Sequence, residues 1–82
     1  MSLETLRARL DELDTELIKL LARRADIVAD VWKWKAENGV PRIDPAREAA
    51  LRERLLSQAQ TLGLSRSAVS DVLDRIVGRS LR

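Results

Sequence analysis

The sequence predicts an all-α protein, and two observations carry this prediction. Apolar residues recur between positions 3 and 34 at alternating steps of three and four, which is the spacing of one face of a helix. Glycine and proline number only 3 and 2 in 82 residues, and neither occurs before position 39. We therefore expect a single domain, residues 1–82, built from one long and two short helices.

The long helix is expected to run from Leu3 to about Glu37. Ser2 can cap its first turn, and Asn38-Gly39 is a helix-stop signal. Its apolar seam consists of two rows: Leu3, Leu10, Leu17, Arg24 and Val31 in one, and Leu6, Leu13, Leu20, Ile27 and Trp34 in the other. Arg24 thus occupies a core position. A buried guanidinium is costly unless an anion meets it, so Arg24 is the first candidate for a binding residue.

Two shorter helices follow. Asp44 as N-cap and Pro45 at the first helical position begin a helix that is expected to run to about Thr61. Ser65 caps a third helix, which is expected to run to about Ser80. The residues expected to face inward are Leu51, Leu55, Leu56, Ala59 and Leu62 in the second helix, and Val69, Val72, Leu73, Ile76 and Val77 in the third.

The length of the first helix predicts a second chain. Thirty-five residues of helix would be roughly 50 Å long, longer than a compact domain of this size is wide. The two short helices together about equal the long one, so the short pairs of two chains could flank two long helices. We therefore expect an intertwined helical homodimer.

Composition excludes several classes of function. The chain has no Cys and no His, which excludes thiol nucleophiles, histidine bases and zinc sites of the usual kind. We also expect no other metal site and no cofactor. The net charge is +2 with both signs interspersed, which does not favour a nucleic-acid partner. No stretch resembles a membrane span or a signal peptide, and a cytoplasmic protein is expected.

The candidate residues for chemistry cluster around Arg24. Steps of seven and four place Arg24, Val31 and Lys35 on one helix face. Either they face an anion, or Arg24 pairs with a buried carboxylate while Lys35 extends to solvent. Arg47 lies in the first turn of its helix, where a positive charge interacts unfavourably with the helix dipole. It is therefore either directed at a ligand or an ordinary surface arginine. Asp44 is most simply the N-cap of the second helix. The backbone N–H groups beside it could donate to a ligand oxygen.

Four further residues have alternative interpretations. Arg7 is a solvated charge in one chain, but in an antiparallel dimer it would lie near Arg24 of the partner. Ser80 continues the apolar row Val69, Leu73 and Ile76 of the third helix, and a small polar residue at the end of such a row is a candidate site residue. Trp32 and Trp34 alternate with lysines, which could indicate nucleic-acid stacking, but core or subunit packing is the preferred interpretation.

These residues resemble the AroQ-type, all-helical chorismate mutases over nearly the whole chain. The similarity is carried, in order, by Leu6-Arg7-Ala8-Arg9-Leu10-Asp11, Leu13-Asp14, Leu20-Leu21-Ala22-Arg23-Arg24, Val31-Trp32-Lys33-Trp34-Lys35, Asp44-Pro45-Ala46-Arg47-Glu48 and Ile76-Val77-Gly78-Arg79-Ser80-Leu81. The resemblance implies rearrangement of chorismate to prephenate, a step of aromatic amino acid biosynthesis in the shikimate pathway. This pericyclic reaction needs no nucleophile, metal or proton transfer, which suits a chain without His or Cys.

The resemblance also implies roles for individual residues. Arg24, Arg7 of the partner chain and Arg47 would bind the substrate carboxylates, and Ser80 would contact one of them.

The remaining implied roles concern the ring and the ether. Lys35 would donate to the breaking ether oxygen and to a carboxylate. Glu48 would accept from the ring hydroxyl, helped by the backbone around Asp44, and Val31 would form an apolar wall.

Two departures from the family pattern are visible. Many members carry Gln or Glu one turn after the serine, whereas this sequence ends two residues after Ser80. Trp32 stands where a small residue is expected. The short tail with Gly-Arg also resembles weakly active mutases that a DAHP synthase activates, so one alternative is a weakly active subunit that a DAHP synthase activates or that regulates one. A separate alternative within the same resemblance is a 4-amino-4-deoxychorismate mutase. An isochorismate-pyruvate lyase is a more distant alternative.

Overall fold

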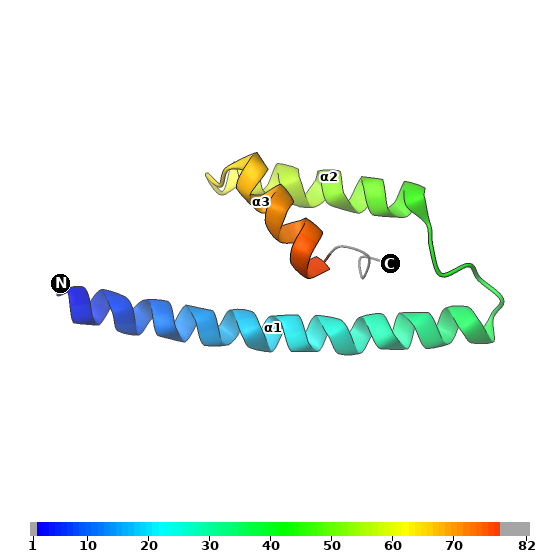
Figure 1. Cartoon of the computed structure of the whole chain (residues 1–82), viewed down its shortest axis with the longest axis horizontal. Coiled ribbons are helices and arrows are strands. Elements are labelled where there is room, and N and C mark those ends of the chain that lie inside the picture. Colours follow the sequence, from blue (N-terminus) through cyan, green and yellow to red (C-terminus); the bar gives the residue numbers. More distant parts are fainter. Residues whose placement is uncertain (1, 78–82) are drawn as a thin grey trace.

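The computed structural model describes residues 2–77, and side chains within 2–75, as a set of helices without a strand. These are α1 (Leu3–Glu37), α2 (Pro45–Thr61) and α3 (Arg66–Val72), the last followed by a π-helical turn, Leu73–Val77. The prediction of one long and two short helices is confirmed for this part of the chain. In Figure 1, α1 is a long rod, and α2 and α3 lie on one side of it, away from its first turns.

The three predicted helix starts are confirmed by their caps. The side chains of Ser2, Asp44 and Ser65 each accept a hydrogen bond from the backbone N–H three residues later, at 3.1, 3.1 and 3.4 Å. Each cap satisfies a donor that the first helical turn leaves without an intrahelical partner. Pro45 occupies the first helical position after Asp44, as predicted.

The two predicted helix stops are formed by Gly39 and Gly63. Their φ angles are +67° and +80°, in the left-handed region that glycine adopts at little cost. In both cases the residue after the glycine donates its N–H to the carbonyl five residues earlier, at 2.9 Å. This is the Schellman arrangement, which satisfies carbonyls at a helix C-terminus and turns the chain.

The predicted third helix forms but does not stay α-helical along its described length. The α-helical part ends at Val72, and the next five residues form a wider π-helical turn. Arg52 of α2 contacts this segment, with its guanidinium 2.7 Å from the Asp74 carboxylate. A π turn changes the direction in which later side chains point, and here it brings Asp74 to Arg52 while Leu73 remains buried. Ser80 and the rest of the predicted third helix lie outside the described residues.

The buried apolar residues of the described chain lie on α1, α2 and the π-helical turn: Val28, Leu51, Leu56, Ala59 and Leu73. Two residues expected to face inward do not. Leu62 caps α2 and is 78% exposed, and Val72 is 49% exposed. The buried residue of α1 is Val28, which is not on the predicted seam. The half-buried residues near Val28 include two seam positions, Arg24 and Val31, so the face of α1 turned toward α2 overlaps the predicted seam.

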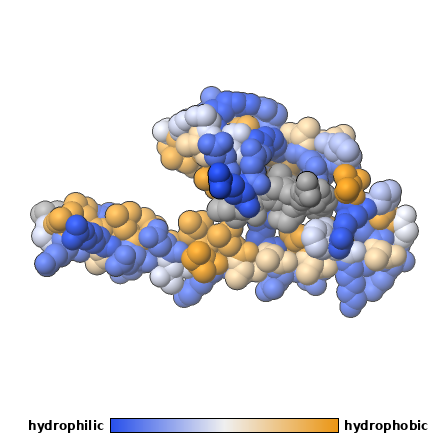
Figure 2. Space-filling view, in the orientation of Figure 1, coloured by the Kyte–Doolittle hydropathy of each residue, from blue (hydrophilic) through white to orange (hydrophobic). Residues whose placement is uncertain are grey.

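The predicted seam of α1 is exposed along the first half of the helix. Its six leucines from Leu3 to Leu20 are between 43% and 60% exposed. Figure 2 shows apolar surface on this projecting end of the molecule, which α2 and α3 do not cover. The long axis of the chain extends 55 Å. Among the residues described, no helix combines the length and the apolar character that spanning a membrane requires.

Candidate active site

The candidate site is a cleft of about 770 Å³ between the second half of α1 and the beginning of α2. Five of the eight predicted site residues line it: Arg24, Val31, Lys35, Asp44 and Arg47. The first three come from α1, where steps of seven and four return the chain to the same face. Asp44 and Arg47 come from the cap and first turn of α2. The N-cap hydrogen bond, from Arg47 N to Asp44 Oδ1 at 3.1 Å, links the last two directly.

The cleft is strongly cationic. Its described lining contains five Arg or Lys side chains and one carboxylate, Asp44. Arg23 and Arg54 are members of this set that the sequence analysis did not select. A periodicity argument could have found Arg54, which follows Arg47 by seven residues and so lies on the same face of α2. Such a lining favours an anion with more than one negative charge.

Apolar residues form the rest of the wall. They are Leu20, Ile27, Val28, Val31, Leu51 and Leu55. Clefts that combine an apolar wall with a few charged groups are the usual form of small-molecule sites. The charged groups fix the orientation of an anionic ligand, while the apolar wall contacts its carbon skeleton.

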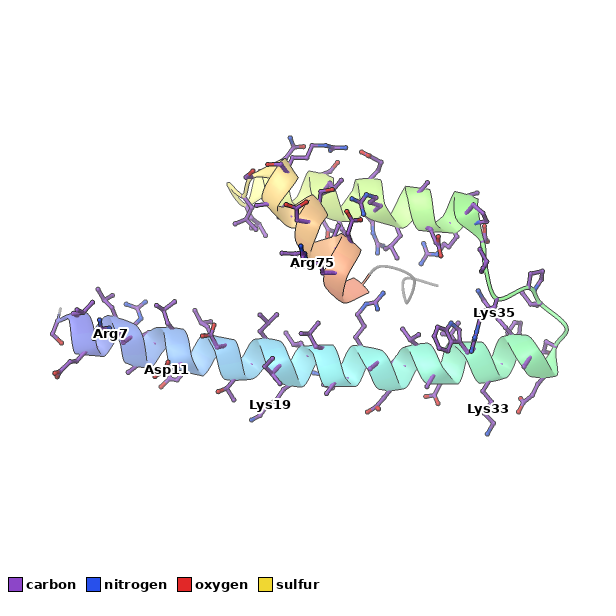
Figure 3. The ribbon with its side chains drawn as sticks, in the orientation of Figure 1. Arg7, Asp11, Lys19, Lys33, Lys35 and Arg75 are labelled. Carbon is purple, nitrogen blue, oxygen red and sulfur yellow. The ribbon has the colours of Figure 1, made fainter. Side chains whose placement is uncertain are left out.

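The connector between α1 and α2 lies against the end of α1. Lys35 Nζ donates a hydrogen bond to the main-chain carbonyl of Arg42 at 3.3 Å. The guanidinium of Arg42 lies over the Trp32 ring, 3.8 Å from its centroid, which is a cation–π contact. Figure 3 shows Lys35 directed toward the connector and Lys33 directed away from it.

The structure does not bring all predicted residues into the cleft. Glu48 is half-buried in the first turn of α2 but is not part of the described lining. Arg7 lies near the opposite end of α1 from Lys35 (Figure 3). The 28 residues between them correspond to about 42 Å of helix, so Arg7 does not reach the cleft of its own chain. Ser80 is outside the described residues.

The two tryptophans differ in environment. Trp32 is half-buried beneath Arg42, whereas Trp34, a seam position, is 58% exposed within the single chain. The packing role expected of Trp32 is therefore partly filled within the chain, by the connector. Sequence periodicity could not identify Arg42 as its partner, because an arginine in a short connector belongs to no repeating pattern.

Comparison with known proteins points to one family. The family model for chorismate mutase type II matches residues 6–82. Curated relatives include the T-protein of Haemophilus influenzae, 38% identical over 79 residues, which are 96% of this chain and 21% of that protein. The 4-amino-4-deoxychorismate mutase of Streptomyces venezuelae is 32% identical over 80 residues, 98% of this chain and 78% of that protein.

A third relative is the chorismate mutase of Methanocaldococcus jannaschii, 36% identical over 53 residues, which are 65% of this chain and 54% of that protein. No solved structure matches the chain significantly. The chain spans about a fifth of the length of the two T-proteins it matches.

The family match covers the long helix, the connector and α2, and therefore every described segment that lines the cleft. It also includes the motifs on which the resemblance was stated. The chain thus belongs to the chorismate mutase type II family, a family of isomerases.

Proposed function

We propose that this protein is a chorismate mutase that rearranges chorismate to prephenate in a cytoplasmic homodimer. The observation that carries the proposal is the cationic cleft, in which Arg24, Lys35 and Arg47 meet beside an apolar wall. Chorismate is a dianion with an enolpyruvyl ether, so it needs cations for two carboxylates and a donor for one ether oxygen.

Binding of the dianion would hold it in a reactive shape. Arg24 and Arg47 face the cleft from different helices, so they can hold carboxylates at two separate points. A guanidinium presents parallel N–H donors that match a carboxylate, which fixes orientation as well as charge. Arg7 of the partner chain and Ser80 would complete the binding. Because the bound substrate is already confined to its compact conformer, less entropy is lost between the bound substrate and the transition state.

The chemical step requires one C–O bond to break while one C–C bond forms within the same molecule. Negative charge develops on the ether oxygen as its bond lengthens, and Lys35 would donate to that oxygen. A donor fixed in place stabilises this charge without reorganisation during the reaction. Glu48 would accept from the ring hydroxyl with help from the backbone near Asp44, and Val31 would limit ring movement. No proton, metal or cofactor takes part.

A homodimer would supply what a single chain lacks. The exposed leucines of α1 form an apolar stripe of a kind that monomers rarely leave uncovered. Arg7 lies at the end of this stripe, about 42 Å along α1 from Lys35. If two α1 helices packed antiparallel, Arg7 of each chain would approach the cleft of the other. Each dimer would then have two shared sites, and residues 1–82 of each chain would act as a single domain.

Turnover of chorismate, followed by its loss of ultraviolet absorbance, tests the proposal. The wild-type protein should consume chorismate and form prephenate, and Arg24→Ala should abolish turnover while circular dichroism and oligomeric state stay unchanged. Wild-type protein without turnover would contradict the proposal. An Arg24→Ala variant that unfolds would indicate instead that Arg24 is held in a structural ion pair.

A second candidate substrate is 4-amino-4-deoxychorismate. The relative from Streptomyces venezuelae is named for that reaction, and this chain aligns with 78% of its length. The two substrates differ at one ring substituent, which is an amine in place of a hydroxyl. Parallel assays with chorismate, 4-amino-4-deoxychorismate and isochorismate would identify the preferred substrate, and pyruvate release from isochorismate would reveal lyase activity.

A regulatory subunit is the alternative from another functional class. Such a protein would turn over chorismate weakly by itself and faster with a DAHP synthase. Measuring turnover with and without that enzyme separates the two functions, since strong activity of the isolated dimer would exclude the regulatory interpretation.

A further inference from the structure

We propose that Trp32 and Arg42 are positioning residues that hold the Lys35 ammonium in the cleft. The inference rests on the proposed function and extends it to two residues that do not line the cleft themselves. Their effect on the substrate would be indirect, through the placement of Lys35. The geometry consists of one stacked pair and one hydrogen bond, both involving Arg42.

Arg42 makes two different contacts with α1. Its guanidinium lies 3.8 Å from the centroid of the Trp32 ring, and its main-chain carbonyl accepts a hydrogen bond from Lys35 Nζ at 3.3 Å. Trp32 and Lys35 are three residues apart, so they lie on neighbouring positions of one helix face. Stacking of the Arg42 side chain on the Trp32 indole therefore fixes the position of the Arg42 carbonyl, to which the Lys35 ammonium donates.

The rest of the connector supports this arrangement from both ends. Gly39 turns the chain out of α1 with a positive φ of 67°, and Asp44 begins α2 with its capping hydrogen bond. Arg42 lies between these two fixed points. Its stacking on Trp32 adds a third, so that the connector is held to α1 along its length.

Lys35 is a residue for which such positioning matters. An ammonium on a four-carbon stem has many rotamers, and each of them places the charge elsewhere. The group carries three N–H donors, so donation to the Arg42 carbonyl is compatible with donation to a ligand. Since misplacement of a catalytic group by 1 Å can reduce a rate on the order of a hundredfold, a fixed acceptor for Lys35 would have a measurable effect.

Two alternatives to a positioning role exist. Arg42 could act by its charge alone, adding to the positive potential near the cleft, or the pair could simply stabilise the fold. Arg42→Lys keeps the charge but loses the planar guanidinium, and Trp32→Phe keeps an aromatic face. Comparison of these conservative variants with the alanine variants separates stacking from charge and from general stability.

The experiment measures kcat and KM for chorismate with wild type, Arg42→Ala, Arg42→Lys, Trp32→Ala and Trp32→Phe, with Lys33→Ala as control. Lys33 is two residues from Lys35, exposed and directed away from the connector (Figure 3). Both alanine variants should lower kcat about tenfold while KM changes less than about threefold. Trp32→Phe should stay within about threefold of wild type. Arg42→Lys should fall between wild type and Arg42→Ala, because an ammonium can contact the ring face but cannot stack on it as the planar guanidinium does. Lys33→Ala should match wild type.

The double variant Trp32→Ala/Arg42→Ala provides the decisive comparison. If the two residues act as one unit, its kcat should equal that of either single variant rather than fall by the product of both. Additive losses would overturn the proposal, and so would full activity of Arg42→Ala. Wild-type activity for both Arg42→Lys and Trp32→Ala would assign the effect to charge alone and would also overturn it.

A second readout needs no substrate. In a Trp34→Phe background, the fluorescence of Trp32 should change on Arg42→Ala and stay constant on Lys33→Ala. Unchanged Trp32 emission in Arg42→Ala would show that the stacked pair does not form in solution. A wild-type protein without any turnover would overturn the proposed function and the positioning role with it, whereas an active wild type with undisturbed variants would overturn the positioning role alone.

Discussion

Arg52 of α2 and Asp74 of the π-helical turn form an ion pair with 2.7 Å between Nη1 and Oδ1. The same guanidinium also donates to the side chain and the carbonyl of Ser70. One arginine thus fastens the last turn of α3 and the π-helical turn to α2. Near the other end of α3, Arg66 pairs with Glu53 at 2.6 Å.

Removal of the Asp74 carboxylate should have a small effect on stability. The side chains of Arg52 and Asp74 are 30% and 61% exposed, so water screens the pair. We expect Asp74→Asn to lower the free energy of unfolding by about 0.2–1 kcal/mol, as measured by urea denaturation. Arg52→Ala should cost more, because it also removes the bonds to Ser70. Equal losses in the two variants would contradict this ranking.

Loss of the Lys35 ammonium should affect the chemical step. We expect Lys35→Ala to reduce kcat on the order of a hundredfold or more, because it removes the proposed donor to the ether oxygen. Lys33→Ala removes a similar charge two residues away, from the side that faces away from the connector. Steady-state kinetics with chorismate should show wild-type values for this control. A comparable loss in both variants would indicate a general effect of charge.

Shared sites predict that two inactive variants complement one another. Arg7→Ala and Arg24→Ala should each be inactive as homodimers. Unfolded and refolded together in equal amounts, half of the dimers are mixed, and each mixed dimer has one intact site out of two. We therefore expect about a quarter of wild-type activity. Sites formed within one chain would give no recovery on mixing.

The apolar stripe on α1 predicts a specific effect on oligomeric state. Leu13 is 60% exposed in the single chain, and the proposed partner helix would cover it. Leu13→Glu would place an unpaired charge in that interface and should shift the protein toward monomer in analytical ultracentrifugation. Lys19→Glu, an exposed change of charge on the same helix, should leave the assembly intact. A Leu13→Glu variant with unchanged mass would argue against this interface.

Asp44 is the N-cap of α2 and also lines the cleft, where we propose that it contributes to binding. Two substitutions separate the capping role from the proposed binding role. The Asp44 side chain accepts from Arg47 N at 3.1 Å. Asp44→Ala removes the cap and should lower stability by about 0.5–2 kcal/mol, measured by thermal unfolding. Asp44→Ser keeps a capping oxygen and should retain most of the stability, so that any change in KM reports the loss of the carboxylate.

Local signals predicted the helices well. Ser2, Asp44 and Ser65 act as caps, and Gly39 and Gly63 end helices, because each of these effects depends on neighbours in sequence. The position of the π-helical turn could not be predicted in this way. Its contact with α2 joins residues 22 positions apart, and a search for helical periodicity does not detect such a pair.

The packing face of α1 was predicted less well, for a related reason. The strongest repeat, from Leu3 to Trp34, describes a surface that one chain leaves exposed. A weaker set is the less exposed face within the chain: Leu21, Arg24, Val28, Val31, Trp32 and Lys35. Arg24 and Val31 belong to both sets. The two faces of this helix overlap, and periodicity ranks the longer one first.

The straight course of α1 has a consequence for how its length can change. Arg7 and Arg24 are 17 residues apart on one uninterrupted helix. Inserting or deleting a single residue between them would turn one about 100° around the helix axis relative to the other and shift it by about 1.5 Å. Inserting seven residues would nearly restore the direction but lengthen the helix by about 10 Å. Length variation between Arg7 and Arg24 should therefore be poorly tolerated, whatever the inserted residues are.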